Sequence, residues 1–506
     1  MPVFDQTYQT LKEHLQQTAI FSSIEELLGW DERTLLPAQA GSYRADQMTV
    51  LAGLIHQRRT APAVGEWLDT LESSLSTSHP ADSPEAAEVR EARRDYDRES
   101  KIPQKLVEEL AKTSVLAQQA WAEARAQDNF AEFAPWLEKT LDLKRDQADA
   151  LGYTDDPYDV LLDEFEPGET AANLRQVLSR LRDELAPLVA EIVATGKQAP
   201  VELLQRDYSI DKQKSFARFA AKSTGFDFDC GRIDLTVHPF CATLGPKDCR
   251  ITTRYEENAF SSGFFSVLHE AGHGIYEQGL PDQEFGMPLG TATSLGIHES
   301  QSRLWENFVG RSFAFWEYFF PKLQLEFAST TRDIALDDFF FAINDVRPSL
   351  IRVEADEATY NLHILIRFEL EQALLNQDLS VADLPGAWNE KYSEFLGVRP
   401  PDDAQGCLQD IHWSGGAIGY FPTYSLGNLY AAQLFESANS DLGALQDQFR
   451  RGEFGTLREW LRDKVHQHGR RYPAKQLVQD VCGEPLSHEP LIRHLRSKLQ
   501  PLYGLA

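Results

Sequence analysis

Three ionisable residues, His269, Glu270 and His273, lie in the stretch FFSVLHEAGHGIYEQG at 264–279, which otherwise has the apolar pattern of a buried helix. On a helix the two histidines are one turn apart and face the same way. Both neutral rings can then reach one metal ion at about 2.0–2.1 Å, the usual Zn–N distance. Glu270 lies about 100° around the axis, where it can accept a proton from a water that the metal activates. The spacing predicts a hydrolytic metal site; the competing interpretation is a pair of core histidines satisfied by hydrogen bonds.

A catalytic zinc site needs a third protein ligand and one open position. The next predicted helix starts near Leu295 and reads SLGIHESQSRLWENF, with Ile297 and Leu304 on its apolar side. Glu299 falls on the polar side and is the candidate for the third ligand. The alternative is an ordinary surface ion pair between Glu299 and Arg303, and spacing alone does not choose between the two.

The elements that position these residues are mostly helices. Apolar residues recur at helical spacing in four ranges, 5–28, 105–150, 171–197 and 262–278, and a polar helix is predicted within 79–95. The pattern changes to a period of two in RIDLTVHPF and CRITTRY, which predicts strands. The link between them carries Gly245 and Pro246, so a small antiparallel hairpin is expected just before the candidate metal helix.

Composition restricts the class of protein. The 506 residues carry a formal net charge of −29, which disfavours binding to nucleic acid or to an anionic membrane. No stretch resembles a membrane span or a signal peptide. The five cysteines form no C-x-x-C pair and are too sparse for a disulfide framework. We therefore expect a cytoplasmic protein.

Six short motifs, in chain order, resemble those of the thermostable carboxypeptidases, the carboxypeptidase Taq or M32 family of zinc metallopeptidases. They are HPF at 238–240, D-x-R-x-T at 248–252, HEAGH at 269–273, HESQ at 298–301, I-R-x-x-A-D at 351–356 and G-x-x-Q-D-x-H-W at 406–413. Segments that begin at Trp30 and Tyr158 are also similar to the family, so the resemblance extends over nearly the whole chain.

The resemblance implies a mainly α, boat-shaped metallopeptidase with a deep substrate groove and a small β-hairpin or sheet near the active site. It implies one peptidase domain over residues 1–506, with a helical part at 1–200 that forms a groove wall or lid and a catalytic part at 201–506. It implies Glu299 as the third ligand of Zn²⁺, with Co²⁺ as a substitute. It also implies a homodimer that removes single residues from the free C-termini of peptides with broad specificity.

A carboxypeptidase must recognise a terminal carboxylate, which a planar guanidinium binds with two parallel hydrogen bonds. Arg352, in the I-R-x-x-A-D motif, is the first candidate. Its alternative is a salt bridge to Glu354, Asp356 or another acid. Arg250, on the predicted hairpin, is a weaker candidate for substrate binding.

The glycine-rich segment HWSGGAIGYFPTYSLGN at 412–428 supplies candidate hydrogen-bond donors to the oxyanion that forms at the scissile carbon. They are His412, Tyr420 and Tyr424, and aromatic packing beside a turn is the alternative for each. His238 can contact substrate at the end of a strand whose edge pairs with peptide backbone. The alternative is that His238 is only a turn residue that precedes Pro239.

Two other functions compete with the carboxypeptidase hypothesis. An endo-acting oligopeptidase on a similar helical scaffold would cut peptides whose C-terminus is blocked. A non-catalytic helical protein could hold the metal structurally, although the presence of Glu270 speaks against it.

Overall fold

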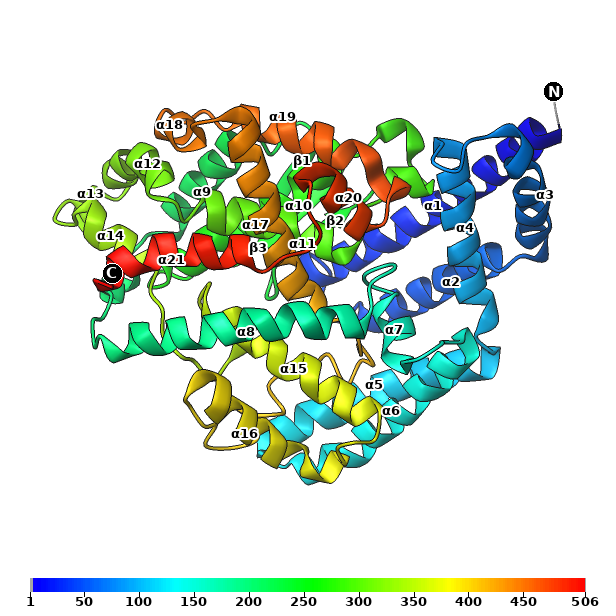
Figure 1. The fold of residues 1–506 in the computed structure, drawn as a ribbon, viewed down its shortest axis with the longest axis horizontal. Helices are drawn as coiled ribbons and strands as arrows, with labels where there is room; N and C mark the ends of the chain where they lie inside the picture. The colour runs from blue at the N-terminus through cyan, green and yellow to red at the C-terminus, as the bar shows by residue number, and fades with distance from the viewer. Residues whose placement is uncertain (1–2, 506) are drawn as a thin grey trace. The chain divides into compact units, whose positions relative to one another are not determined.

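The computed structural model describes residues 3–505, and these residues are mainly α-helical with one small three-stranded sheet (Figure 1). The mainly α fold class predicted from the sequence is confirmed. The chain divides into two compact units, each built from three segments. The division of the peptidase domain into parts at 1–200 and 201–506 stays a prediction.

Unit 1 contains residues 1–100, 200–343 and 434–483. Its first segment forms α1 (Val3–Thr34), α2 (Gly41–Arg59), α3 (Pro62–Ser78) and α4 (Pro84–Lys101). Its second segment forms η1 (Val201–Gln205), α9 (Ile210–Thr224), β1 (Gly231–Leu235), β2 (Cys241–Thr243), β3 (Cys249–Thr253), α10 (Phe260–Gly279), η2 (Asp282–Glu284), η3 (Pro288–Gly290), α11 (Leu295–Arg303), η4 (Leu304–Val309), α12 (Phe313–Glu326), α13 (Ala328–Thr331) and α14 (Leu336–Ile343). Its third segment forms α18 (Leu445–Arg450), α19 (Gly455–Lys464), η7 (His466–Arg471) and α20 (Ala474–Cys482).

Unit 2 contains residues 101–199, 344–433 and 484–506. Its elements are α5 (Gln104–Gln127), α6 (Phe130–Leu151), α7 (Pro157–Leu162), α8 (Ala171–Ala194), η5 (Arg352–Glu354), α15 (Thr359–Leu375), η6 (Val381–Asp383), α16 (Leu384–Leu396), most of α17 (Pro422–Leu442) and α21 (Glu489–Tyr503).

The sheet corrects the predicted hairpin. The two predicted strands are β1 and β3, and they pair in parallel, with Gly231 opposite Cys249. The antiparallel partner of β3 is β2, so the strand order is β1-β3-β2. A period of two fixes which face a side chain takes but not the direction of its strand, and β2 is too short to show a period. The turn at Gly245 and Pro246 joins β2 to β3, not β1 to β3.

The predicted helix at 105–150 is two helices. Asp128 takes a left-handed conformation with φ 53° at the end of α5, and α6 begins at Phe130. Asp and Asn adopt this conformation more readily than most residues because their short polar side chains bond locally. The Asp128-Asn129 pair was the sequence signal for this break.

The core of unit 1 surrounds the first half of α10. The apolar residues of this helix pack against rings from several other helices, and Figure 1 shows the sheet and α11 beside it. The buried rings in contact include Phe216, Phe260, Phe264, Phe315, Trp316, Phe319, Phe327 and Phe339. Such aromatic pairs add about 0.5–1.5 kcal/mol each beyond area burial, so this end of α10 is held firmly.

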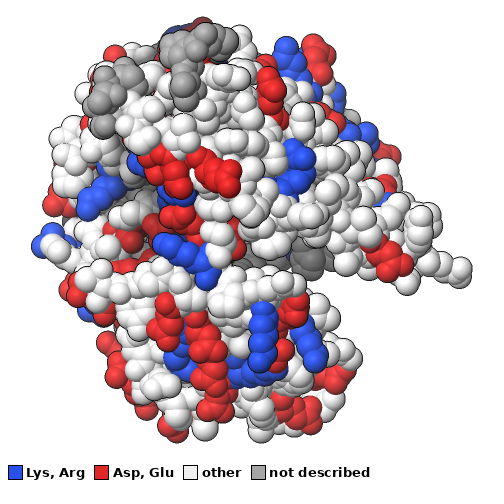
Figure 2. All heavy atoms as spheres, turned by 90° about the vertical axis from the view of Figure 1, so that its right-hand side faces the viewer, with Lys and Arg blue, Asp and Glu red and all other residues white. Residues whose placement is uncertain are grey.

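The acidic side chains are dispersed on the face that Figure 2 shows, with Lys and Arg side chains among them. The acidic residues on this face therefore have the distribution of an ordinary solvated surface. Among residues 3–505, no helix has the length and apolar character needed to span a membrane.

Candidate metal centre

The two candidate histidines lie on α10, which extends from Phe260 to Gly279 and so contains the helix predicted at 262–278. His269 and His273 are one turn apart, and their ring centroids are 4.9 Å apart at nearly right angles. Both side chains are mostly buried, with 19% and 14% exposure. The helix therefore places two imidazoles side by side on one face.

Glu299 lies on α11, which starts after Ser294, whose hydroxyl accepts a hydrogen bond from the Ile297 backbone N–H. The two helices pack closely because Gly272 has no side chain. A Cβ at Gly272 would lie 2.6 Å from the Gln301 carbonyl oxygen and 2.6 Å from the Ser302 Cα. The glycine within HEAGH thus allows α11 to bring Glu299 to the histidine pair.

The ligand atoms converge on one point. Glu299 Oε2 is 3.6 Å from His269 Nε2 and 3.5 Å from His273 Nε2. Ligands of a tetrahedral ion at about 2.0–2.1 Å stand about 3.3 Å apart, so the three residues fit a single divalent ion. The donor set of two imidazoles and one carboxylate leaves one position open, as catalytic zinc sites do.

The other ring nitrogen of each histidine has its own acceptor. His269 Nδ1 lies 3.0 Å from Glu306 Oε2, and His273 Nδ1 lies 3.0 Å from the His298 carbonyl oxygen. A hydrogen on each Nδ1 leaves the Nε2 lone pairs directed at Glu299, because a neutral imidazole carries one N–H. These contacts fix the tautomer and orientation of both rings, as is usual for metal-binding histidines.

Arg303 links the two acids of this region. Its Nε donates to Glu299 Oε1 at 2.7 Å, and its Nη1 is 3.5 Å from Glu306 Oε2. Although burial opposes ionisation, Arg303 and His269 hold the pKa of Glu299 well below its usual range. Burial likewise opposes ionisation of Glu306, but the hydrogen bond with His269 and the charge of Arg303 lower its pKa to about 2. Both carboxylates are thus ionised at neutral pH, and the predicted Glu299–Arg303 pair is part of a buried network, not a surface contact.

Glu270 lies beside the converging atoms and is only 6% exposed. Burial raises its pKa to about 7, opposed mainly by the charge of His269. Within residues 3–505 its carboxylate forms no hydrogen bond. A carboxylate with a raised pKa and no fixed partner can exchange a proton with a water molecule near neutral pH.

Replacing Glu306 with glutamine is expected to weaken divalent-metal binding by about 10- to 100-fold, because His269 loses the charged acceptor of its Nδ1 hydrogen. Competition against a chromophoric chelator measures this affinity directly. Glu317→Gln is the matched control, since Glu317 pairs with Arg450 on the exposed side of α12. Equal affinities for the two variants would contradict the role of Glu306.

Arg352 lies in unit 2 and is buried against Asp410, so its acid partner is neither Glu354 nor Asp356 but another acid, as the alternative allowed. Its Nε and Nη2 donate to Asp410 Oδ1 at 3.0 and 2.9 Å, and its Nη1 donates to the Tyr360 hydroxyl at 3.1 Å. Asp410 Oδ2 also accepts a hydrogen bond from Arg367 Nε at 2.7 Å. Two buried guanidiniums therefore share one carboxylate, which leaves an excess of positive charge in this cluster.

The three candidate donors in 412–428 lie close together in unit 2. The Tyr424 hydroxyl is 3.4 Å from His412 Nε2, and the rings of Tyr420 and Tyr424 meet edge to face with centroids 5.3 Å apart. Burial lowers the pKa of His412 to about 4, so this imidazole is neutral at pH 7. The structure therefore brings His412, Tyr420 and Tyr424 together, while their catalytic roles stay predictions.

The two remaining candidates lie on the sheet and the loop that follows β1. Arg250 on β3 pairs with Asp248, at 2.9 Å for both contacts, and stacks over the Trp30 ring at 4.3 Å. His238 is exposed in the loop between β1 and β2. Arg250 thus has structural partners, and His238 is open to solvent.

Sequence reasoning assigned no role to three residues of these clusters. The helical pattern placed Glu306 on the same polar face as Glu299, which it follows by seven residues, but did not indicate its contact with His269. The turn of Glu306 is the π-helix η4, a feature that often marks functional sites. Glu277 continues the i, i+4 series of His269 and His273. Arg367 carried no signal, because its partner Asp410 is 43 residues away.

Comparison with known proteins assigns the chain to a family. The carboxypeptidase Taq (M32) metallopeptidase family matches residues 10–499. Thermostable carboxypeptidase 1 of Thermus thermophilus is 47% identical over 98% of this chain and 99% of its own. Carboxypeptidase 1 of Bacillus subtilis is 40% identical over 97% of each chain. The crystal structure of the M32 carboxypeptidase from Deinococcus radiodurans R1 superposes with a TM-score of 0.95 at 41% identity, covering 99% of this chain and 100% of that one.

These relatives are named as carboxypeptidases, which does not favour the endo-acting alternative. The family is metal-dependent, and residues 3–505 contain a three-residue cluster able to hold a divalent ion. The chain therefore belongs to the carboxypeptidase Taq (M32) family and is a metal-dependent carboxypeptidase that acts on peptides.

Proposed function

We propose that His269, His273 and Glu299 hold the catalytic divalent ion and that this ion is zinc, with cobalt as a working substitute. The observation that carries the proposal is the convergence of two Nε2 atoms and one carboxylate oxygen. Imidazole and carboxylate donors suit both metals. When bound, zinc supplies a Lewis acid that polarises the scissile carbonyl and lowers the pKa of bound water to about 7.

Glu270 is the general base in this proposal. Its carboxylate accepts a proton from the attacking water and later delivers that proton to the leaving amine. Its burial beside the ligands and its lack of a hydrogen-bond partner among residues 3–505 support this role. A donor from His412, Tyr420 or Tyr424 stabilises the oxyanion. The neutral form of His412 suits a donor that keeps its N–H at working pH.

Arg352 recognises the terminal carboxylate of the substrate, which places the cut one residue from the end and gives broad specificity. The excess positive charge of Arg352 and Arg367 over Asp410 supports binding of an added carboxylate beside this cluster. His238 and Arg250 are further candidates for contact with the peptide, through the loop and strand on which they lie.

We also propose a cytoplasmic homodimer in which residues 1–506 act as one peptidase domain, with 1–200 as groove wall or lid and 201–506 as the catalytic part. Five free cysteines support a reducing compartment. The homodimer follows from the family resemblance and is checked by light scattering.

Peptide digestion followed by mass spectrometry tests the function. We expect a ladder that loses one C-terminal residue at a time, which a chelator stops and which added Zn²⁺ or Co²⁺ restores. A peptide of the same sequence with an amidated C-terminus is expected to resist cutting, because the carboxylate for Arg352 is gone. Internal cuts in the amidated peptide would instead support the endo-acting alternative.

A further inference from the structure

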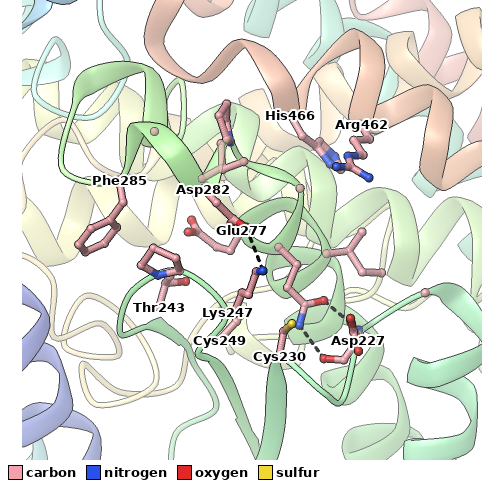
Figure 3. A pocket seen from close by; sticks show the side chains of 18 of the residues that line it. Asp227, Cys230, Thr243, Lys247, Cys249, Glu277, Asp282, Phe285, Arg462 and His466 are labelled. Carbon is pink, nitrogen blue, oxygen red and sulfur yellow. Dashed lines mark hydrogen bonds and ion pairs between the residues drawn. The ribbon is translucent and has the colours of Figure 1, made fainter.

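A cavity of about 350 Å³ opens at the C-terminal end of α10, and none of the three candidate metal ligands lines it (Figure 3). Its walls come from the β2–β3 turn, the end of α10, the turn after it and α19. Ile275, Leu280 and Phe285 give it an apolar part, and charged side chains of both signs stand around it. The cavity is therefore suited to a small ligand that is both charged and apolar.

The charged residues of the cavity differ in how they are paired. Lys247 lies 3.9 Å from Asp282, as the dashed line in Figure 3 marks, and Arg458 Nη2 lies 2.5 Å from Glu459. Arg462, on α19 beside His466 in Figure 3, forms no ion pair with any residue between 3 and 505. The cavity thus presents one guanidinium that is not committed to a carboxylate.

Glu277 supplies the opposite charge. It lies on α10 one turn after His273, and its side chain keeps 16% exposure in the wall of the cavity. Although burial opposes ionisation, the hydrogen bond from His298 lowers its pKa, so this carboxylate is ionised. No step proposed for catalysis uses it. A partly exposed carboxylate and an uncommitted guanidinium around an apolar space match the ammonium, carboxylate and side chain of an amino acid.

We propose that this cavity binds a free α-amino acid, with its ammonium at Glu277, its carboxylate at Arg462 and an apolar side chain against Ile275, Leu280 and Phe285. Free amino acids are what a carboxypeptidase releases, so the ligand is a product of the enzyme's own reaction. The carboxypeptidase activity is used here only to identify the ligand. Because binding is measured without turnover, failure of this proposal and failure of the proposed function can be told apart.

The contacts of Glu277 connect this cavity to the metal centre. Its Oε1 accepts a hydrogen bond from His298 Nε2 at 2.8 Å. The ring of His298 stacks on that of His273 with centroids 4.5 Å apart, and the His298 carbonyl accepts from His273 Nδ1. An ammonium group at Glu277 competes with His298 for the same carboxylate. Amino-acid binding and metal binding are therefore coupled, and each changes the affinity of the other by the same factor.

Calorimetric titration of the full-length holoenzyme with L-leucine tests the site. Arg462→Gln is expected to weaken leucine binding by about tenfold or more, since a charge-assisted pair is lost. Arg458→Gln is the matched control from the same helix and is expected to bind leucine as the unaltered protein does. N-acetyl-leucine lacks the ammonium and leucinamide lacks the carboxylate, so both are expected to bind more weakly than leucine.

The outcomes separate this site from the metal centre. Absence of leucine binding, or binding that Arg462→Gln leaves unchanged, would overturn the proposal, the latter by placing leucine elsewhere. The coupling is read from zinc affinity in a chelator competition, where leucine is expected to shift the affinity by about fivefold or more. Leucine binding that depends on Arg462 but leaves zinc affinity unchanged would support the site and overturn its coupling.

Discussion

Replacing Glu270 with glutamine is expected to lower kcat by about 10²- to 10⁴-fold, the range that a positioned general base contributes. The amide keeps the size and the buried position of the side chain but cannot accept the water proton. His269, His273 and Glu299 remain in place, so the metal content is expected to be unchanged. Steady-state rates with a peptide substrate, together with metal analysis of the same preparation, measure both quantities.

The metal content distinguishes loss of the general base from loss of the bound metal. Glu299→Gln also removes a negative charge next to the histidines, but it weakens metal binding as well as activity, because it alters a ligand. Glu270→Gln with bound metal and undiminished kcat would show that another group takes the proton. The same rates in Glu317→Gln report any general effect of exchanging an acid for its amide.

Replacing Asp410 with asparagine is expected to reduce the free energy of unfolding by about 3–5 kcal/mol, because breaking a buried charged pair leaves its partner unsatisfied. Here two guanidiniums lose their shared acid, since both Arg352 and Arg367 are bound to Asp410 and are almost fully buried. Urea titration of the full chain, followed by circular dichroism, measures the change.

An exposed ion pair provides the comparison for this effect. Asp447 pairs with Arg450 at 2.6 Å, but its side chain is 61% exposed. Asp447→Asn is therefore expected to change the free energy of unfolding by less than about 1 kcal/mol. A similarly small effect of Asp410→Asn would mean that water or backbone groups satisfy the two guanidiniums, and the cluster would then not depend on this carboxylate.

Features encoded over one or two turns were predictable from the sequence. The apolar pattern predicted α10 and the start of α11, and the spacing of HEAGH placed His269 and His273 on one face. Short-range rules suffice here because helical periodicity relates neighbours three or four residues apart. The family resemblance added Glu299, which spacing alone left undecided between a ligand and a partner of Arg303.

Features that depend on distant segments were not predictable in the same way. Alternation marked β1 and β3 as strands but did not reveal that both run in the same direction. The chain between them forms β2, which pairs with the far side of β3. The alternative for Arg352 was a salt bridge to Glu354, Asp356 or another acid, and the sequence did not single out Asp410, its partner 58 residues away. A single sequence contains no record of which of many acids an arginine meets after folding.

The order of segments along the chain has a consequence for protein synthesis. Unit 1 includes residues 434–483 and unit 2 includes residues 484–506, so neither is complete until these segments have been made. In unit 1, Arg470 pairs with Asp95 at 2.7 Å, and His466 Nε2 lies 3.0 Å from Gln301 Oε1. A nascent chain that has already released residues 1–433 from the ribosome still exposes the surfaces that these partners cover. At a synthesis rate of about 5–20 residues per second, that exposure lasts for seconds, a period in which chaperones can act on the growing polypeptide.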